Sequence, residues 1–252
     1  MKIQYCSDLH LEFPENRRYL KENPIESVGD ILILAGDILP FALNDKDYEF
    51  FNDVSSEFET VYWLPGNHEY YYSDISTFEN EQFRQIRENV FVVDNVQVDL
   101  DGITLYFSTL WSYIKPENEF DIRQGVSDFH VIKYNTGAFL PEHFNRLHHS
   151  ALEFLNQISR ERRQVQSVMI THHVPTLINY PKKYKNSPVN NAFAVELFDF
   201  IQQSHFDYWI FGHHHTNIPG FEIGKTKMIT NQLGYVKYNE QKGFSIQRII
   251  EL

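Results

Sequence analysis

The stretch Asp30-Ile31-Leu32-Ile33-Leu34-Ala35-Gly36-Asp37 sets the fold class. Its uninterrupted apolar run lacks the polar alternation of a half-exposed strand, and it therefore predicts a strand that is buried on both faces. Such strands belong to sheets that are covered on both sides, as in α/β proteins. Gly36 ends the run, and the carboxylate of Asp37 follows where the predicted strand ends.

Similar apolar or alternating segments recur along the chain. Strands are predicted at residues 1–6, 60–64, 167–170 and 208–211, and further alternating segments at 96–107, 219–231 and 244–250. Helical patterns are found near 46–58, 74–88, 140–160 and 190–203, and the polar, aromatic stretches 112–139 and 174–191 are expected to be long loops. This order of strands and helices predicts an α/β fold with mixed sheets.

Length and composition limit the class of protein. A chain of 252 residues allows one large domain or two small ones, and 42% hydrophobic residues exclude a disordered chain. The longest apolar run, 31–35, is far shorter than the roughly 20 residues needed to cross a bilayer. Cys6 is the single cysteine, so neither an internal disulfide nor a cysteine-based zinc site is possible, and we expect a cytoplasmic protein.

The chain is acidic, with 22 lysine and arginine residues against 34 aspartate and glutamate residues and a formal charge of −12. Such a charge repels the phosphate backbone of nucleic acids and anionic membrane surfaces, so we expect neither as a partner. A phosphate substrate bound by metal ions stays possible, because the ions dominate the local field.

Five predicted strand ends carry side chains that bind metals, and three of these ends contain a glycine where we expect a sharp turn. The metal-binding residue types at these ends are Asp8, His10, Asp37, Asn67, His68, Glu69, His172, His173, His213, His214 and His215. Ligands in α/β sheets bind beyond the carboxyl ends of the strands. A purely structural role would bury several charges unpaired, at a cost of several kcal/mol each. We therefore expect a metal site.

The donor types indicate which metals are bound. Oxygen and nitrogen ligands without thiolate suit manganese, iron, zinc, cobalt or nickel. The set is too large for one open tetrahedral zinc, whereas two divalent ions that share a carboxylate would use it. Two-metal sites serve displacement at phosphorus.

In order, Asp8-x-His10, Gly36-Asp37, Gly66-Asn67-His68-Glu69, His172 and Gly212-His213-x-His215 resemble the five motifs of the calcineurin-like metallophosphoesterases. The resemblance implies two face-to-face mixed β-sheets flanked by helices, a four-layer αββα sandwich, and a single domain over residues 1–252. It also implies that one metal is held by Asp8, His10 and His215, that the other is held by Asn67, His172 and His213, and that Asp37 bridges them. By the same resemblance, His68 is the catalytic residue facing the leaving group, and a metal-bridging hydroxide is the nucleophile.

The chain departs from the protein serine/threonine phosphatase branch of that family. Pro40 and Phe41 stand where that branch has an aspartate that orients the histidine and an arginine that holds phosphate. The residue that orients His68 is therefore open, with Glu69 and Asp45 as candidates. The branch that cleaves a lipid A precursor has arginine in place of His68, so that activity is not expected either.

Three further residues are candidates for contact with the substrate or for support of a metal ligand: Glu69, His173 and Tyr70. The Tyr70–Tyr72 run either stacks on an aromatic group of the substrate or packs into the core. The basic cluster at 181–185 either recruits an anionic substrate or forms a solvated loop.

Together these features predict a phosphoesterase that uses two divalent transition-metal ions, with Mn²⁺ as the ion of choice in assays. We expect a soluble phosphodiester substrate, because no lysine or arginine lies within the five motifs and a monoanion needs less cationic support than a dianion. Two alternatives stay open. One is a nuclease of the same family, and the other is a catalytically silent metal-binding scaffold for protein assembly.

Overall fold

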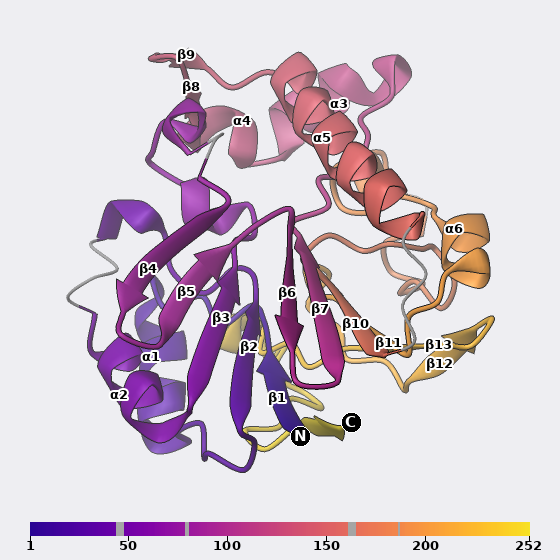
Figure 1. Ribbon diagram of the computed structural model, residues 1–252. Helices are drawn as coiled ribbons and strands as arrows, with labels where there is room; N and C mark the ends of the chain where they lie inside the picture. Colours follow the sequence, from indigo (N-terminus) through magenta and orange to yellow (C-terminus); the bar gives the residue numbers. More distant parts are fainter. Residues whose placement is uncertain (44–47, 79–80, 161–164, 186) are drawn as a thin grey trace.

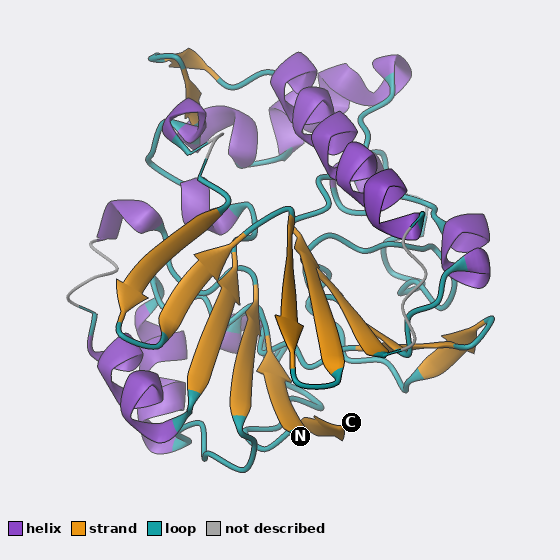
Figure 2. Ribbon diagram, viewed as in Figure 1, coloured by secondary structure: helices purple, strands orange, loops and turns teal. Residues whose placement is uncertain are grey.

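The computed structural model describes residues 1–43, 48–78, 81–160, 165–185 and 187–252. Two six-stranded sheets form its centre (Figures 1 and 2). The first sheet has the strand order β14 (Ile249–Glu251), β1 (Lys2–Cys6), β2 (Ile31–Ala35), β3 (Thr60–Leu64), β5 (Val90–Val93) and β4 (Phe83–Arg87). The second has the order β12 (Phe221–Ile223), β13 (Thr226–Ile229), β11 (Tyr208–Ile210), β10 (Gln166–Thr171), β7 (Ile103–Ser108) and β6 (Val96–Leu100).

Both sheets are mixed. Strands β1, β2, β3 and β5 are parallel, and β14 and β4 pair antiparallel at the two edges. The second sheet repeats this plan, with parallel β7, β10, β11 and β13 between antiparallel β6 and β12. The predicted strands at 1–6, 60–64, 167–170 and 208–211 are confirmed, as is the strand predicted from the 30–37 stretch.

The alternation of side chains along β2 explains the layers. Ile31, Ile33 and Ala35 pack between the two sheets, against residues such as Leu105 and Ile170. Leu32 and Leu34 point to the opposite face, because successive side chains of a strand alternate. All five residues of β2 are buried, as a strand covered on both sides requires.

Helices cover the two outer faces of the sheets. On the first sheet, Leu20 of α1 (Pro14–Glu22) and Phe51 of α2 (Glu49–Glu57) pack against Leu32 and Trp63. On the second, Leu155 of α5 (Pro141–Ser159) and Ile201 of α6 (Phe198–Gln203) join a cluster that contains Met169 and Trp209. The layers are therefore helix, sheet, sheet and helix, which confirms the predicted sandwich.

The helix predicted at 74–88 is wrong. Among its described residues this stretch forms a 3₁₀ turn at Ile75–Thr77 and then the edge strand β4, which pairs with β5. The apolar residues of β4, Phe83 and Ile86, are three positions apart, which is a helical spacing, and only Ile86 is buried. Pairing with β5, which lies outside residues 74–88, makes this segment a strand.

The prediction of a loop over 112–139 is also wrong. The segment contains α3 (Glu119–Gly125), α4 (Asp128–Val131) and the hairpin of β8 (Lys133–Tyr134) and β9 (Gly137–Ala138). These elements lie at the top of Figure 1, above the sheets, where Ile122 and Phe129 pack with Trp111, Phe139 and Phe144. They are too short to show a period in the sequence.

Smaller differences concern element boundaries. Helix α6 occupies only the last part of the predicted 190–203 helix, and β14 only the end of the 244–250 segment. Helix α1 was not predicted; Pro14 stands in its first turn, where the missing amide hydrogen costs nothing. In the described ranges, none of the helices is both long and apolar enough to cross a membrane.

Candidate metal centre

Residues of the five motifs meet at one end of the sheets. Asp8 follows β1, Asp37 follows β2, and Asn67 and His68 follow β3 in the first sheet, while His172 follows β10 and His213 follows β11 in the second. Carboxyl ends of parallel strands share one edge of a sheet, and the two sheets present these edges to each other. The centre thus draws on both sheets.

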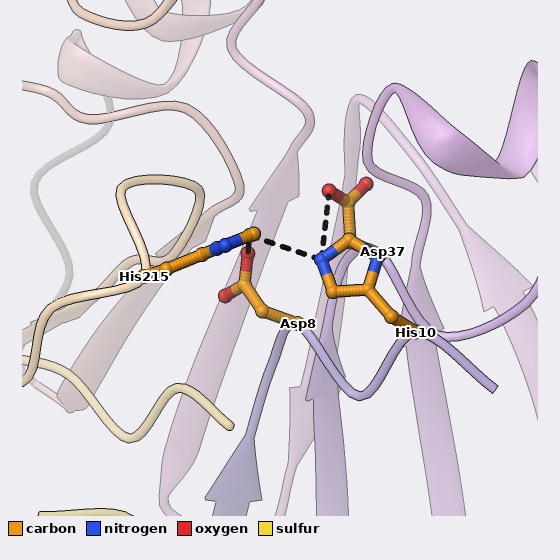
Figure 3. A group of neighbouring side chains, drawn as sticks. All are labelled: Asp8, His10, Asp37 and His215. Atoms are coloured by element: carbon orange, nitrogen blue, oxygen red, sulfur yellow. Dashed lines mark hydrogen bonds and ion pairs between the residues drawn. The ribbon is translucent and has the colours of Figure 1, made fainter. Parts of the chain in front are cut away.

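The first group of donors is Asp8, His10, Asp37 and His215, whose donor atoms lie within 4.8 Å of one another (Figure 3). His10 Nε2 and His215 Nε2 are 2.9 Å apart. His215 Nε2 is 3.3 Å from Asp8 Oδ1. His10 Nε2 is 3.8 Å from Asp37 Oδ2. These are the side chains that the resemblance assigns to the first metal.

The second group contains Asp37, His172 and His213. His172 Nε2 lies 3.3 Å from Asp37 Oδ1 and 3.0 Å from His213 Nδ1. Asn67 adds an amide: its Nδ2 donates to Asp128 Oδ1 at 2.8 Å, while its buried Oδ1 has no hydrogen-bond partner among the described residues. That oxygen is therefore available as a ligand.

Asp37 lies between the two groups. Its Oδ2 faces His10 and its Oδ1 faces His172. Burial alone would raise the pKa of Asp37, but the attraction of His172, His68 and His10 outweighs it, so the pKa falls well below its usual range. One ionised carboxylate therefore serves both donor groups, which is the geometry that a bridging ligand needs.

These residues fit two divalent cations. Two fully or almost fully buried carboxylates, Asp8 and Asp37, lie among imidazoles that approach each other through ring nitrogens. Burial without compensating positive charge is costly for carboxylates. Imidazole, carboxylate and amide donors without thiolate are typical of sites for first-row transition metals.

The backbone of the candidate ligands is in an uncommon conformation. Positive φ angles are found at Asp8 (56°), His10 (47°), Asp37 (57°), His213 (76°) and His215 (46°). Non-glycine residues pay about 1–3 kcal/mol each for sparsely populated conformations of this kind, which persist only where the surroundings enforce them. Backbone bonds such as His10 N to Asp37 O, at 2.9 Å, provide part of that enforcement.

The motif glycines allow other side chains of the centre to approach the backbone closely. Of the three motif glycines Gly36, Gly66 and Gly212, only Gly36 has a positive φ, 91°. A Cβ atom on Gly66 would lie 2.2 Å from Asp37 Oδ1 and 2.6 Å from His172 Nε2. Side chains of the metal centre fill the space that any other residue would need.

His68 is oriented by Glu12, a residue that sequence reasoning missed. His68 Nδ1 lies 2.8 Å from Glu12 Oε1, and the same oxygen is 3.3 Å from His10 Nδ1. The ring of Tyr71 stacks on His68 at 4.0 Å, and the Tyr235 hydroxyl lies 3.3 Å from its Nε2. Burial lowers the pKa of His68, but Asp37 and Glu12 outweigh it, and the pKa is raised.

Of the two expected partners of His68, only Glu69 lies within the described residues, and its carboxylate binds backbone groups instead of the His68 ring. Asp45 lies outside the described residues. Glu69 is fully buried and accepts hydrogen bonds from the backbone N–H groups of Asp37 (3.0 Å), Ile38 (2.7 Å) and Gly66 (2.6 Å). Burial raises the pKa of Glu69 to about 7. This side chain therefore holds the backbone of two motifs together.

The other two candidates lie in different surroundings. The buried ring of His173 is 4.3 Å from that of His213, and burial lowers the pKa of His173 to about 3, so the ring is neutral. Tyr70 packs between Phe41 and Trp111 in the core, away from the donor groups. Its neighbour Tyr71 contacts His68 instead.

Three further residues of the centre had little or no signal in the sequence. Glu12 lies two residues after His10, in the turn before α1, and only its closeness to the first motif hinted at a role. Asp128 lies in the segment that we expected to be a loop, and Glu240, whose Oε2 is 2.7 Å from His215 Nδ1, lies far from any motif.

Fold and donor groups together define a metal-dependent phosphoesterase built on two packed sheets. The sequence profile of the calcineurin-like phosphoesterases matches residues 1–217, and the chain belongs to that family. The uncharacterized protein L509 of Acanthamoeba polyphaga mimivirus is 30% identical over 281 residues, which cover 99% of this chain and 96% of that protein. The phosphopantetheinyl hydrolase of Mycobacterium tuberculosis has a similar structure, with a TM-score of 0.73 at 14% identity, covering 99% of this chain and 95% of that one.

Proposed function

We propose that the protein hydrolyses a soluble phosphodiester with the help of two divalent metal ions. The observation that carries the proposal is the position of Asp37, whose two carboxylate oxygens face two different donor groups. Asp8, His10 and His215 would hold one ion, and Asn67, His172 and His213 the other. Mn²⁺ is the ion we would use first, and iron, zinc, cobalt and nickel suit the same donors.

Two ions at this position would supply Lewis acidity and a water molecule of lowered pKa. The residues of the chain orient the proposed acid and hold its proton. Glu12 accepts from His68 Nδ1, so that Nε2 is directed away from Glu12 and towards the cavity at the centre. With its raised pKa, His68 can hold a proton on Nε2 and donate it to the leaving oxygen. Tyr71 stacks on the ring and limits its rotation.

The charge around the centre supports a diester. Phe41, at the position of the phosphatase arginine, packs against Trp63, and the guanidinium of Arg84 lies over the Phe41 ring, 4.5 Å from its centroid. In the described residues, no lysine or arginine lines the cavity beside the donor groups. A monoester dianion would lack a cationic partner other than the metals, whereas a diester monoanion needs less compensation.

The alternatives are weaker. A nuclease would need a basic surface along its groove, and the chain has a net charge of −12. A catalytically silent scaffold would have no use for the bond between Glu12 and His68, a residue that we assign to no metal. Buried, unpaired Cys6 supports a reducing compartment such as the cytoplasm.

The test compares bis-(p-nitrophenyl) phosphate with p-nitrophenyl phosphate in the presence of Mn²⁺. Both esters release the same leaving group, so the comparison reports on charge and substitution at phosphorus. We expect a higher kcat/KM for the diester and loss of both activities on chelation. A preference for the monoester across several leaving groups would contradict the diester proposal and would point to Lys182, Lys183 or Lys185 as an unrecognised cationic contact.

A further inference from the structure

We infer that the organic group of the substrate is an uncharged, flat ring, and that a second anionic group on the substrate is rejected. The inference rests on the proposed phosphodiester hydrolysis and specifies its substrate. It comes from the cavity beside the metal centre rather than from the ligands themselves.

The cavity has a volume of about 330 Å³ and contains the donor side chains Asp37, Asn67 and His213 in its wall. Ligand pockets range from roughly 300 to 1,000 Å³, so this one is at the small end. It has room for a phosphoryl group and one ring-sized substituent. A long polymer would have to leave most of its length outside.

Aromatic rings form much of the wall and connect directly to the centre. Phe193 stacks on the ring of His213 at 4.8 Å, and Tyr71 stacks on His68 at 4.0 Å. Tyr235 lies 4.5 Å from the ring of His215. Tyr180 and the aliphatic Val126 and Val189 also line the cavity. A flat ring bound between such faces gains stacking contacts, which an aliphatic group of equal bulk makes less well.

Apart from the histidines of the centre, the charged side chains of the wall are acidic. Asp128 and Glu240 line the cavity together with Asp37, and no lysine or arginine does so in the described part of the chain. Asp128 holds Asn67 and Tyr71, and Glu240 holds His215, so both carboxylates are fixed in place. The positive charge of the metals lies at one end, where the phosphoryl group binds. An anionic substituent inside the cavity would therefore meet these carboxylates, and no lysine or arginine of the described wall would offset them.

Lys183 is a basic residue outside the wall whose charge acts on two residues of the wall, His214 and Glu240. It is exposed, and its ammonium lies 4.4 Å from the ring centroid of Tyr184, which is itself part of the wall. If the ammonium of Lys183 bound an anionic substituent beside Tyr184, the protein would prefer the anionic substrate over the neutral one. The experiment must separate these two cases.

The test uses two methyl aryl phosphodiesters, methyl 4-carbamoylphenyl phosphate and methyl 4-carboxyphenyl phosphate. Each has one ring, the two rings are nearly equal in shape, and only the second carries an additional charge. After correction for their hydrolysis rates in solution, we expect the neutral ester to have a kcat/KM at least about 10-fold higher. Equal values, or a preference for the carboxylate that is lost in Lys183→Ala, would overturn the inference.

Two matched variants test whether the wall of the cavity sets the ratio of the two kcat/KM values. Val189→Lys places a cation in the wall and should narrow the ratio, whereas Leu177→Lys, at an exposed position outside the wall, should leave it unchanged. If Val189→Lys does not fold, the wild-type ratio still decides. Hydrolysis of neither ester, nor of bis-(p-nitrophenyl) phosphate, would refute the proposed function; hydrolysis of both without discrimination would refute only this inference.

Binding provides a readout that does not depend on turnover. Monomethyl esters of benzylphosphonate and cyclohexylmethylphosphonate carry the same charge, but only the first has a flat ring. In calorimetry with the metal-loaded protein, we expect tighter binding of the benzyl compound by roughly 3-fold to 10-fold, as aromatic contacts typically provide. Equal affinity would show that the rings in the wall do not select a flat group.

Discussion

At the scale of single residues, the carboxylate of Glu12 connects a proposed metal ligand with the proposed acid. One oxygen lies within hydrogen-bonding distance of both His10 Nδ1 and His68 Nδ1. In the protein phosphatase branch, the orienting aspartate comes from a different motif, at the position that is Pro40 here. Here Glu12, two residues after the first motif, provides the carboxylate.

Glu12→Gln should lower kcat by roughly 10-fold to 100-fold for diesters with poor leaving groups, because His68 loses its anionic partner. The loss should be smaller for p-nitrophenol, which needs no proton. Measurements at saturating metal, with metal content determined for each sample, separate this effect from weaker binding through His10. Glu22→Gln, at an exposed position of α1, serves as the control.

The double variant tests whether Glu12 acts through His68. His68→Ala alone should lower kcat by roughly 10²–10⁴-fold for poor leaving groups. In that background, Glu12→Gln should have little additional effect, because the group that it orients is gone. If the losses of the two single variants multiply in the double variant, Glu12 acts independently of His68, through the proposed ligand His10.

At the scale of elements, the short helix α4 supports the second donor group. Asp128, its first residue, is buried and accepts from both Asn67 Nδ2 (2.8 Å) and the Tyr71 hydroxyl (2.9 Å). The element thereby turns Asn67 Oδ1 towards the centre and also holds the ring that stacks on His68.

Asp128→Ala should weaken binding of one of the two metals by roughly 10-fold to 100-fold, because the amide of Asn67 loses its fixed orientation. Metal titration followed by calorimetry should show one weakened and one unchanged site. Asp121→Ala, on the exposed face of α3, should leave both unchanged. Equal weakening of both sites in Asp128→Ala would mean that the substitution disturbs the whole centre and not only the orientation of Asn67.

At the scale of the whole molecule, the last part of the chain completes both sheets. Strand β13 extends the second sheet beside β11, and β14 pairs with β1, so that the two termini lie side by side at the lower edge of Figure 1. Leu233 is fully buried in the core, and Tyr235 and Glu240 contact His68 and His215. We propose that residues 1–252 form one domain, although the family profile ends at residue 217.

A chain cut after residue 217 should therefore fail to show a cooperative thermal transition, whereas the full chain should unfold in a single step. Leu233→Ala is a milder version of the same change and should cost about 2–5 kcal/mol of stability. Leu43→Ala, at a position that is 45% exposed, should change stability by less than about 0.5 kcal/mol. A cooperative melt of the 1–217 chain would show that the profile region folds alone.

Metal removal should destabilise the protein as a whole. An ion present at 100 times its Kd stabilises the folded state by about 2.7 kcal/mol, which for a chain of this size corresponds to a Tm shift of roughly 5–10 °C. Differential scanning calorimetry with Mn²⁺ and with a chelator measures the shift. Asp37→Asn should reduce it for both ions together, since the shared carboxylate is lost; an unchanged shift would contradict bridging.

The sequence alone was sufficient for most of the buried parallel strands, although not for β5, and for the donor side chains at the strand ends. Runs such as Ile31–Ala35 contain their own signal, because a strand buried on both faces needs an apolar residue at every position. Asp8, Asp37 and His172 each lie within two residues of the end of a parallel strand, so their meeting at one edge follows from the topology of parallel strands. The sandwich itself came from the resemblance to a family, and the structure confirms it.

Only the tertiary structure decided the elements that depend on distant partners. The edge strand β4 exists because β5 pairs with it, and its own residues have the spacing of a helix. Glu12, Asp128 and Glu240 became part of the centre through contacts with residues up to 61 positions away, as between Asp128 and Asn67. A single polar side chain has no period and no neighbouring motif. Its role is set by the geometry that brings a distant ligand within hydrogen-bonding distance, and that geometry exists only in the folded chain.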